Sequence, residues 1–166
     1  MSINYVKGNL FRLAAKPATE PVYLAHACNC LGVWGGGIAA EFRRQFQSTY
    51  KVYHEHCLKY KSDPSELLGT ALIIPADRKD SGYVSGTGDK LSVVCLFTSV
   101  MGGESPEEIA KYTELAMQDL KTQLSQTTTQ YVLAMPKINA GIFGVPWSLT
   151  ERALTAVGVP CTVYEL

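Results

Sequence analysis

The sequence lacks an excess of charge of either sign. It has 15 Lys and Arg residues and 15 Asp and Glu residues among 166, so the formal net charge is zero. Nucleic acids and anionic membrane surfaces attract proteins through excess Lys and Arg. The balance therefore argues against both as partners, and no apolar run approaches the length of a membrane span. We expect a small-molecule ligand and a monomer.

The first residues, MSINYVKGNLF, lack the apolar core of a secretory signal. The chain has five cysteines, an odd number that does not pair off into disulfides. We therefore expect reduced thiols, in a protein of the cytoplasm or the nucleus.

The sequence also lacks the short motifs of several enzyme classes. It contains no G-x-x-x-x-G-K-[ST] segment, which excludes a P-loop NTPase, and no G-x-G-x-x-G segment that opens a helix after a strand, so a dinucleotide site is unsupported. No G-x-S-x-G nucleophile elbow is present. Cys28 lacks the arginine of a cysteine-dependent phosphatase loop, because the sixth residue after it is Trp34. We interpret Cys28 and Cys30 as small apolar side chains or loop thiols.

Metal ligands are not suggested by the histidines. His54 and His56 lie two residues apart on a predicted helix, so their side chains point to different sides. A metal site that used both histidines together with Cys57 and the Cys28/Cys30 pair is therefore not favoured. We expect no metal and no cofactor.

What the sequence does contain is an alternation of apolar strands and amphipathic helices. Strands are predicted at residues 3–6, 22–28, 69–75, 91–97, 131–135 and 161–164, and helices at 38–47, 48–60, 105–124 and 147–157. Ser48 is the predicted cap of the second helix, and residues 76–90 form a predicted mobile surface excursion. The order predicts one three-layer α/β/α domain over residues 1–166, with a largely parallel sheet.

The chain is organised around residues 24–40, LAHACNCLGVWGGGIAA. A buried strand leads into polar and thiol side chains, a glycine triplet follows, and a helix begins at Ile38. Backbone N–H groups at a helix N-terminus have no intrahelical acceptor, and the helix dipole favours an anion there. Taken alone, the segment is equally typical of a glycine-rich turn.

Three segments follow directly after predicted strands, at residues 29–37, 98–103 and 138–144. Ligands of parallel α/β sheets bind at the carboxyl ends of the strands. We therefore predict that the three segments converge on one site.

These segments, taken in order, resemble the macro domain family, the ADP-ribose-binding α/β/α fold. The resemblance covers nearly the whole chain, from INYVKGNLF through HACNCLGVWGGGIA and MPKINAGIFGVPW to TVYEL. Within the family, the chain is most similar to the fungal ADP-ribose 1″-phosphate phosphatases. The resemblance implies a macro-domain fold with a mixed, mostly parallel sheet of about six strands.

The resemblance also implies roles for particular residues. Asn29 would bind the distal ribose, Asn9 would accept a hydrogen bond from the adenine amino group, and Tyr164 would pack on adenine. The substrate-binding set that it implies is Asn9, Gly35, Gly36, Gly37, Ile38, Ser99, Asn139, Gly141, Ile142, Phe143, Gly144 and Tyr164. Backbone N–H groups of the second glycine loop would hold the diphosphate.

One departure bears on the subclass. A related group removes ADP-ribose from protein glutamate with a lysine on the fourth-strand loop and an aspartate in the second loop. Ser99 and Phe143 stand at the corresponding positions, and neither side chain can form a Schiff base or accept a proton. A lysine-dependent mechanism is therefore not expected.

The predicted catalytic residues are His26 and Asn29. Histidine is the usual side chain for proton transfer at neutral pH, so His26 is a candidate for that role, but on a buried strand it is equally explained as a structural histidine. Asn29 would orient the ribose and the attacking water, or form the turn. Trp34 would cover the phosphate or pack under the loop.

Two classes of function stay open. The first is a phosphatase that converts ADP-ribose 1″-phosphate, a compound that the resemblance links to the by-products of tRNA splicing, into ADP-ribose and phosphate. The second is a module that binds free or protein-linked ADP-ribose without turnover. A further enzymatic option is hydrolysis of another ADP-ribose adduct by a route that needs no lysine. They share one pocket, so the fold alone does not separate them.

Overall fold

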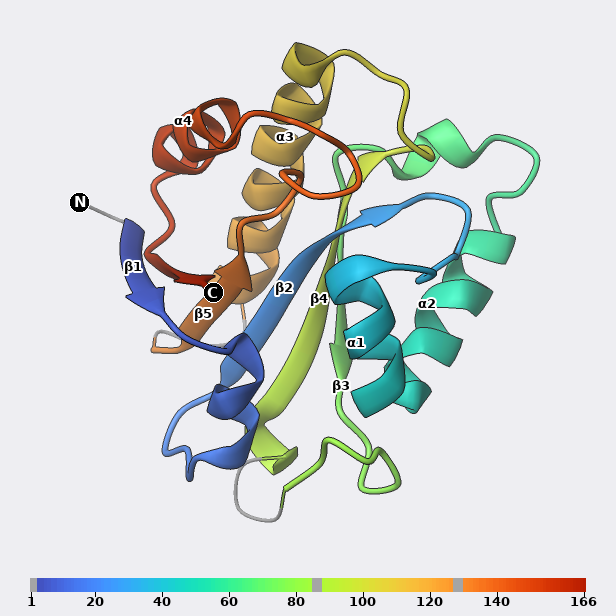
Figure 1. The fold of residues 1–166 in the computed structure, drawn as a ribbon. Helices are drawn as coiled ribbons and strands as arrows, with labels where there is room; N and C mark the ends of the chain where they lie inside the picture. The colour runs from blue at the N-terminus through green and yellow to red at the C-terminus, as the bar shows by residue number, and fades with distance from the viewer. Residues whose placement is uncertain (1–2, 85–87, 127–129) are drawn as a thin grey trace.

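The structure is a computed structural model that describes residues 3–84, 88–126 and 130–166. In these residues six strands form one sheet with helices on both faces, which is the predicted three-layer α/β/α architecture (Figure 1). No helix in these ranges is long and apolar enough to cross a lipid bilayer.

The sheet has the strand order β1-β6-β5-β2-β4-β3. The strands are β1 Ile3–Lys7, β2 Val22–Asn29, β3 Ala71–Pro75, β4 Leu91–Ser99, β5 Val132–Pro136 and β6 Cys161–Glu165. The pairings are parallel except that β3 runs antiparallel to β4. The prediction of a mixed, mostly parallel sheet is confirmed, and the ends of each strand differ from the predicted ones by no more than two residues.

Each face of the sheet carries two helices. Helices α1 Gly37–Gln45 and α2 Gln47–Leu58 cover one face, and α3 Pro106–Ser125 and α4 Trp147–Val157 cover the other (Figure 1). Side chains alternate along a strand. Thus Leu24 and Cys28 of β2 pack in the α1/α2 core, whereas Tyr23 and Ala25 pack in the α3/α4 core.

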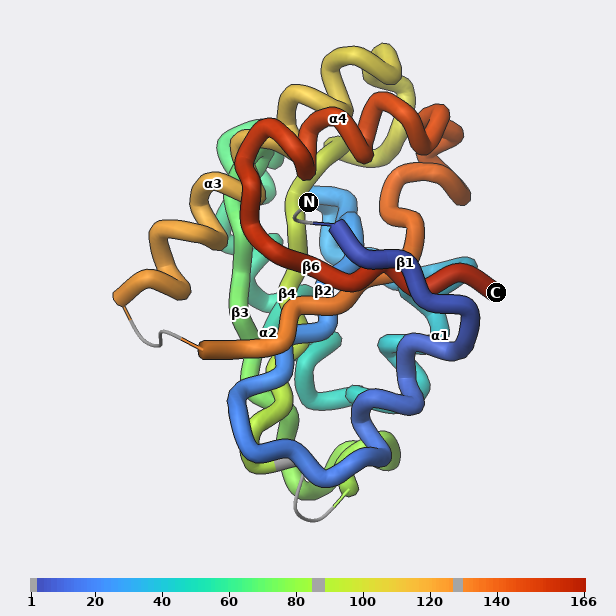
Figure 2. Tube along the Cα trace, turned by 90° about the vertical axis from the view of Figure 1, so that its left-hand side faces the viewer, coloured from blue at the N-terminus to red at the C-terminus, as the bar shows by residue number. Residues whose placement is uncertain are grey.

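Helix α3 begins with the capping box that the sequence indicates. The Ser105 hydroxyl accepts a hydrogen bond from the Glu108 N–H at 3.1 Å, and the Ser105 N–H donates to the Glu108 carboxylate at 3.2 Å. The first and last strands are neighbours, because β1 pairs with β6 (Figure 2). The first and last strands therefore lie next to each other at one edge of the sheet.

A short 3-10 helix, η1 Leu10–Ala15, follows β1 and was not predicted. Asn9 caps it, since its Oδ1 accepts a hydrogen bond from the Phe11 N–H at 2.9 Å. A helix of this length shows too few turns for a periodic apolar pattern to reveal it.

The predicted cap of the second helix is wrong. Helix α2 begins at Gln47, so Ser48 lies inside it. Its first turn is bound by Asp80, which accepts hydrogen bonds from the Ser48 N–H at 2.7 Å and the Ser48 hydroxyl at 2.6 Å. A carboxylate at this end of a helix is favourable, but the partner is 32 residues away and no local pattern shows it.

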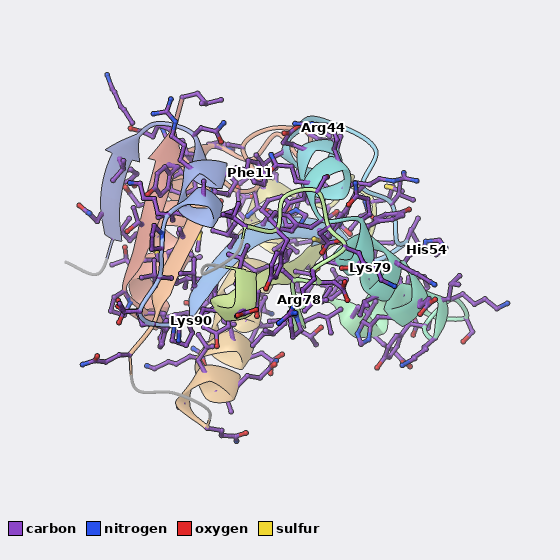
Figure 3. The ribbon with its side chains drawn as sticks, turned by 90° about the horizontal axis from the view of Figure 1, so that it is seen from below. Phe11, Arg44, His54, Arg78, Lys79 and Lys90 are labelled. Atoms are coloured by element: carbon purple, nitrogen blue, oxygen red, sulfur yellow. The ribbon has the colours of Figure 1, made fainter. Side chains whose placement is uncertain are left out.

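The same contacts correct the predicted mobile excursion. Asp80 is buried, and the Gly82 N–H donates to the Gln45 carbonyl at 2.7 Å, so residues 76–84 are anchored to the junction of α1 and α2. Residues 85–87 of the predicted excursion lie outside the described residues. Arg78, Lys79 and Lys90 lie at the lower end of the molecule, away from the carboxyl ends of the parallel strands (Figure 3).

Candidate functional site

A cavity of about 530 Å³ opens at the carboxyl ends of the central strands. It is lined by residues 27–29 at the end of β2, 33–39 before and at the start of α1, 136–139 and 141–143 at and after the end of β5, and Met101 after β4. All three segments predicted to converge therefore contribute to it. Figure 1 shows the loop after β5 curving over the carboxyl end of β2, toward the start of α1.

A second cavity, of about 780 Å³, adjoins the first. The two share Gly37, Ile38, Pro136 and Lys137 in their linings. Asn9 and Tyr164 both line the second cavity, because the pairing of β1 with β6 places the end of each strand at the same edge. Together the cavities form one elongated groove that suits a ligand with two separate ends.

The structure sorts the predicted site residues into three groups. The first cavity is lined by Asn29, Gly35, Gly36, Gly37, Ile38, Asn139, Gly141, Ile142 and Phe143. The second is lined by Asn9 and Tyr164, again with Gly37 and Ile38. Neither cavity is lined by His26, Ser99 or Gly144.

The first loop is held by the side chain of Asn29. Its Oδ1 accepts hydrogen bonds from the N–H groups of Leu31 and Val33, at 3.1 and 3.2 Å, and its Nδ2 donates to the Val33 carbonyl at 2.7 Å. Asn29 is therefore the turn former that the sequence allowed. An amide nitrogen has two hydrogens, and the second one of Asn29 makes no hydrogen bond that the described part of the chain records.

Helix α2 supports this loop from below with three side chains. The Tyr53 hydroxyl lies 2.7 Å from the backbone oxygen of Asn29 and 3.0 Å from its Oδ1. Tyr50 and His54 both bond the Gly32 carbonyl at 3.0 Å. Gly32 has a φ of +80°, and a Cβ there would lie 3.0 Å from the His54 ring, so a side chain at this position would be strained. Sequence analysis missed these supports, although their inward spacing on one helix was visible.

We expect Tyr53→Phe to lower the free energy of unfolding by about 1 to 2 kcal/mol, because it leaves the backbone oxygen of Asn29 without its buried donor, whereas Oδ1 keeps the N–H groups of Leu31 and Val33. Tyr50→Phe is the matched control, and a smaller effect is expected because the Gly32 carbonyl keeps its bond from His54. Urea denaturation of both variants measures the difference. Equal losses in the two variants would contradict this account of the loop.

The second loop is held by Asn139, which has a left-handed backbone with φ of 66°. Its Oδ1 accepts from the Thr98 hydroxyl at 2.8 Å, and its Nδ2 donates to the hydroxyls of Thr113 at 2.9 Å and Thr150 at 3.3 Å. Its carbonyl accepts from the Val145 N–H at 2.9 Å, which closes the loop. The buried amide thus joins β4, α3 and α4, and Asn139 is also part of the cavity lining.

Both loops offer free backbone donors to the first cavity. The N–H groups of Gly141, Ile142 and Phe143 make no hydrogen bond recorded within residues 3–84, 88–126 and 130–166. Opposite them, Gly36 is the N-cap of α1, so the first N–H groups of that helix lack intrahelical acceptors. A ligand with anionic oxygens fits between these two sets of donors.

His26, predicted as a catalytic residue, lies outside both cavity linings. Its side chain is fully buried, stacks on Phe42 with ring centroids 4.1 Å apart, and meets Trp34 at 4.7 Å. Trp34 is itself buried and stacks on Tyr53, so it packs under the loop and does not cover a ligand. The placement of His26 favours the structural interpretation, because a proton-transfer group must reach the reacting atoms.

Ser99 also lies outside both cavity linings, since it is buried and its hydroxyl is bound within the turn after β4. The hydroxyl bonds the Glu104 carboxylate and accepts from the Gly102 N–H at 2.6 Å. Partial burial opposes ionisation of Glu104, but hydrogen bonds from Ser99 and the Val100 N–H outweigh it and hold the pKa of Glu104 below its ordinary value. Ser99 therefore shapes the turn after β4 that carries Met101 to the cavity. Gly144, the third residue outside both linings, donates its N–H to the Gly141 carbonyl within the second loop.

Comparisons with known proteins agree with this geometry. A family model described as Macro domain matches residues 25–154. An ADP-ribose 1″-phosphate phosphatase of Debaryomyces hansenii is 46% identical, with 92% of each chain covered. One of Scheffersomyces stipitis is 44% identical, with 99% of each covered. Among solved structures, the macrodomain of Mycobacterium tuberculosis DarG has a TM-score of 0.71 at 19% identity, covering 99% of this chain and 97% of that one.

Proposed function

The chain belongs to the macro domain family, and on that basis we propose that it is a phosphoric monoester hydrolase that converts ADP-ribose 1″-phosphate into ADP-ribose and phosphate. The relatives that carry this activity in their names match nearly the full length of the chain. One solved structure of similar fold is that of Thermosipho africanus DarTG in complex with ADP-ribose. It has a TM-score of 0.66 at 20% identity, covering 97% of this chain and 41% of that one.

The observation that carries the proposal is the pair of facing backbone donor sets in the first cavity. A diphosphate and a terminal phosphate present many anionic oxygens, and fixed N–H groups bind them without reorganising during the reaction. Gly36, as the N-cap, and Gly141 to Phe143 supply these donors from opposite walls. The groove therefore suits an elongated anion with phosphate at its centre and at one end.

Charged side chains contribute little at this end of the groove. Lys137 is the one cation in the lining of the first cavity, and it pairs with Glu165 at 2.7 Å. Val33, Met101 and Ile142 expose apolar surface at the same cavity. Neutral main-chain donors are thus the main source of charge stabilisation in this proposal.

The adenosine end belongs in the second cavity. Asn9 uses its Oδ1 to cap η1, but a carbonyl oxygen has two lone pairs, so it retains one for the adenine amino group. Tyr164 offers a ring face, and stacking on an aromatic ring accepts any base. Selectivity for adenine would then come from Asn9.

The chemical step is attack of water on the terminal phosphorus. The bond between phosphorus and the anomeric oxygen breaks, and the sugar leaves with a proton as its free hydroxyl. The free Nδ2 hydrogen of Asn29 is available to orient the distal ribose, and the loop donors bind the developing negative charge. We assign His26 the support of Trp34 beneath the loop, and no proton transfer.

The test is phosphate release from ADP-ribose 1″-phosphate by the purified protein, with a chelator present. We expect turnover under these conditions, micromolar or tighter affinity for the product ADP-ribose, and no release from p-nitrophenyl phosphate, which lacks the ADP-ribose part. Calorimetry measures the affinity in parallel.

Two other outcomes have distinct meanings. Tight ADP-ribose binding without phosphate release would replace the phosphatase by a binding module or by a hydrolase of another adduct. Absence of both would contradict the assignment of the groove itself. The proposal is for a monomer of the cytoplasm or nucleus that acts on a small molecule and not on nucleic acid.

A further inference from the structure

Three sulfur- and nitrogen-bearing side chains gather under the floor of the first cavity. They are His26 and Cys28 of β2 and Cys95 of β4, and one donor atom from each lies within 4.8 Å of the others. All three are buried, but Cys28 also lines the cavity, whereas His26 and Cys95 do not. Neither the binding nor the hydrolysis proposed above uses the Cys28 thiol.

The arrangement fits a reactive thiol better than a metal site. The Cys28 sulfur lies 3.6 Å from Nε2 and 3.7 Å from Nδ1 of His26. Because the sulfur is almost equally far from both nitrogens, neither nitrogen directs its lone pair at the sulfur. The orientation of the His26 ring therefore does not favour a metal ion bound by both side chains. The polar groups around the sulfur, from His26, Trp34 and Cys95, stabilise a negative charge on it.

Trp34 supplies an independent observation. Its Nε1–H is buried and has no hydrogen-bond partner within the described residues, which is costly unless something else accepts from it. Burial opposes ionisation of Cys28, but Cys95, His26 and Trp34 together outweigh it and lower the pKa of Cys28 to about 5. A thiolate on Cys28 would therefore give the indole N–H an anionic neighbour.

The other thiols differ in this respect. Burial raises the pKa of each, to about 12 for Cys30 and Cys57, to about 11 for Cys161, and well above the ordinary value for Cys95. In the Cys28–Cys95 pair the proton thus stays on Cys95. Thiolates are the reactive form, and Cys28, although buried, is the cysteine that lines the first cavity among the described residues.

The strand register argues against a disulfide between these two cysteines. Cys28 is paired with Phe97, and Cys95 with His26, so the two thiols are offset by two residues on adjacent strands. With a rise of about 3.3 Å per residue and a strand spacing of about 4.8 Å, the Cα atoms lie about 8 Å apart. Disulfides span less than about 7 Å between Cα atoms.

We propose that Cys28 is a site of covalent oxidation, at which hydrogen peroxide that enters through the ligand cavity converts the thiol to a sulfenic acid. The sulfur electron pair forms a bond to one peroxide oxygen, the O–O bond breaks, and the leaving hydroxide takes up the proton lost by the thiol as water. The sulfur is oxidised by two electrons and the peroxide is reduced. The added oxygen lies at the cavity floor and weakens ligand binding; only this last step rests on the proposed function.

The experiment treats the full chain with hydrogen peroxide and dimedone, which traps sulfenic acids, and quantifies the label on all five cysteines by mass spectrometry. We expect Cys28 to be labelled about tenfold faster than Cys95 or the others, and ADP-ribose in excess to slow the labelling. A rate at Cys28 no higher than at Cys95, or a Cys28–Cys95 disulfide in place of the adduct, would overturn the proposal.

Two variants sharpen the result. Trp34→Phe retains a ring in the stack but removes the N–H, and we expect it to slow labelling of Cys28 several-fold. Cys161→Ser, at another buried thiol that lines neither cavity, is the matched control and should leave that rate unchanged. If Trp34→Phe fails to fold, Cys28→Ala decides: its ADP-ribose affinity should be unaffected by peroxide, whereas the affinity of the unaltered chain should fall.

The outcomes separate this proposal from the proposed function. Calorimetry with ADP-ribose on untreated protein tests the groove alone. Fast labelling of Cys28 in a protein that does not bind ADP-ribose would leave the oxidation site standing and remove the function. Normal ADP-ribose binding with slow labelling of Cys28 would leave the proposed function standing and overturn the oxidation site.

Discussion

Gly36→Val is expected to reduce ADP-ribose affinity by a factor of at least about 100, or about 3 kcal/mol, with little effect on folding. Gly36 has an extended backbone, with φ of −157° and ψ of 169°, which valine also adopts. A Cβ at this position would lie 3.3 Å from the Cδ1 of Ile142 on the opposite loop. The branched side chain would therefore fill the space between the two donor sets, where the phosphates belong.

Calorimetry measures this affinity, and a thermal melt within a few degrees of the unaltered protein checks the fold. Ile142→Ala is the matched control, because it removes atoms from the other side of the same gap. Ile142 is 77% exposed, so its truncation should change neither stability nor affinity strongly. Unchanged affinity in Gly36→Val would place the phosphate site elsewhere.

Asn139→Ala should be the most destabilising substitution in the site, with a loss of about 3 kcal/mol in the free energy of unfolding. It leaves the Thr98 hydroxyl without its acceptor and removes the donor to Thr113 and Thr150, all in the buried interior. It also places alanine in the left-handed backbone region, where a residue with a Cβ is strained and where alanine lacks the side-chain hydrogen bonds of asparagine. ADP-ribose affinity should fall with stability, because the second loop loses its anchor.

Asn139→Gly separates the two causes. Glycine adopts a φ of 66° without strain but restores no hydrogen bond, so we expect it to be more stable than the alanine variant by about 1 kcal/mol. Chemical denaturation of the pair gives the difference. Equal stability would mean that the backbone conformation contributes nothing, and a loss below about 1 kcal/mol in both would contradict the buried network.

The features that could be predicted best from the sequence are those that a short local pattern determines. The glycine triplet, the apolar strand before it and the capping box at Ser105 are local patterns, and the structure has strands and helices at these places. Convergence of three loops followed from parallel topology, because the carboxyl ends of parallel strands share one edge. These inferences required no knowledge of distant contacts.

Sequence reasoning failed where the decisive contact is remote. His26 and Ser99 stand next to the predicted loops, but burial among Phe42 and Trp34, or a bond to Glu104, decides which way each side chain points. Neighbouring positions on a strand face opposite sides, so proximity along the chain does not imply proximity to a ligand. The same reasoning explains why Asp80 was assigned to a mobile excursion, whereas it binds the first turn of α2 through Ser48.

These placements also change how variants should be interpreted. Asn29→Ala would remove the amide that holds the first loop, and His26→Ala would remove the ring beneath Trp34. Loss of activity in either variant would therefore follow from a displaced loop as readily as from a lost catalytic group. Product affinity and stability must be measured on the same samples.

The free N–H groups of the two loops have an evolutionary consequence. A main-chain donor is present whichever amino acid occupies the position, proline excepted, so a point mutation at Ile142 or Phe143 rarely deletes it. Inactivating alleles should instead be those that add atoms at Gly36 or release an anchor such as Asn139. Across a saturation library, tolerated substitutions should therefore be common at Ile142 and Phe143, and the intolerant positions should be Gly36, where added atoms fill the cavity, and buried anchors such as Asn139.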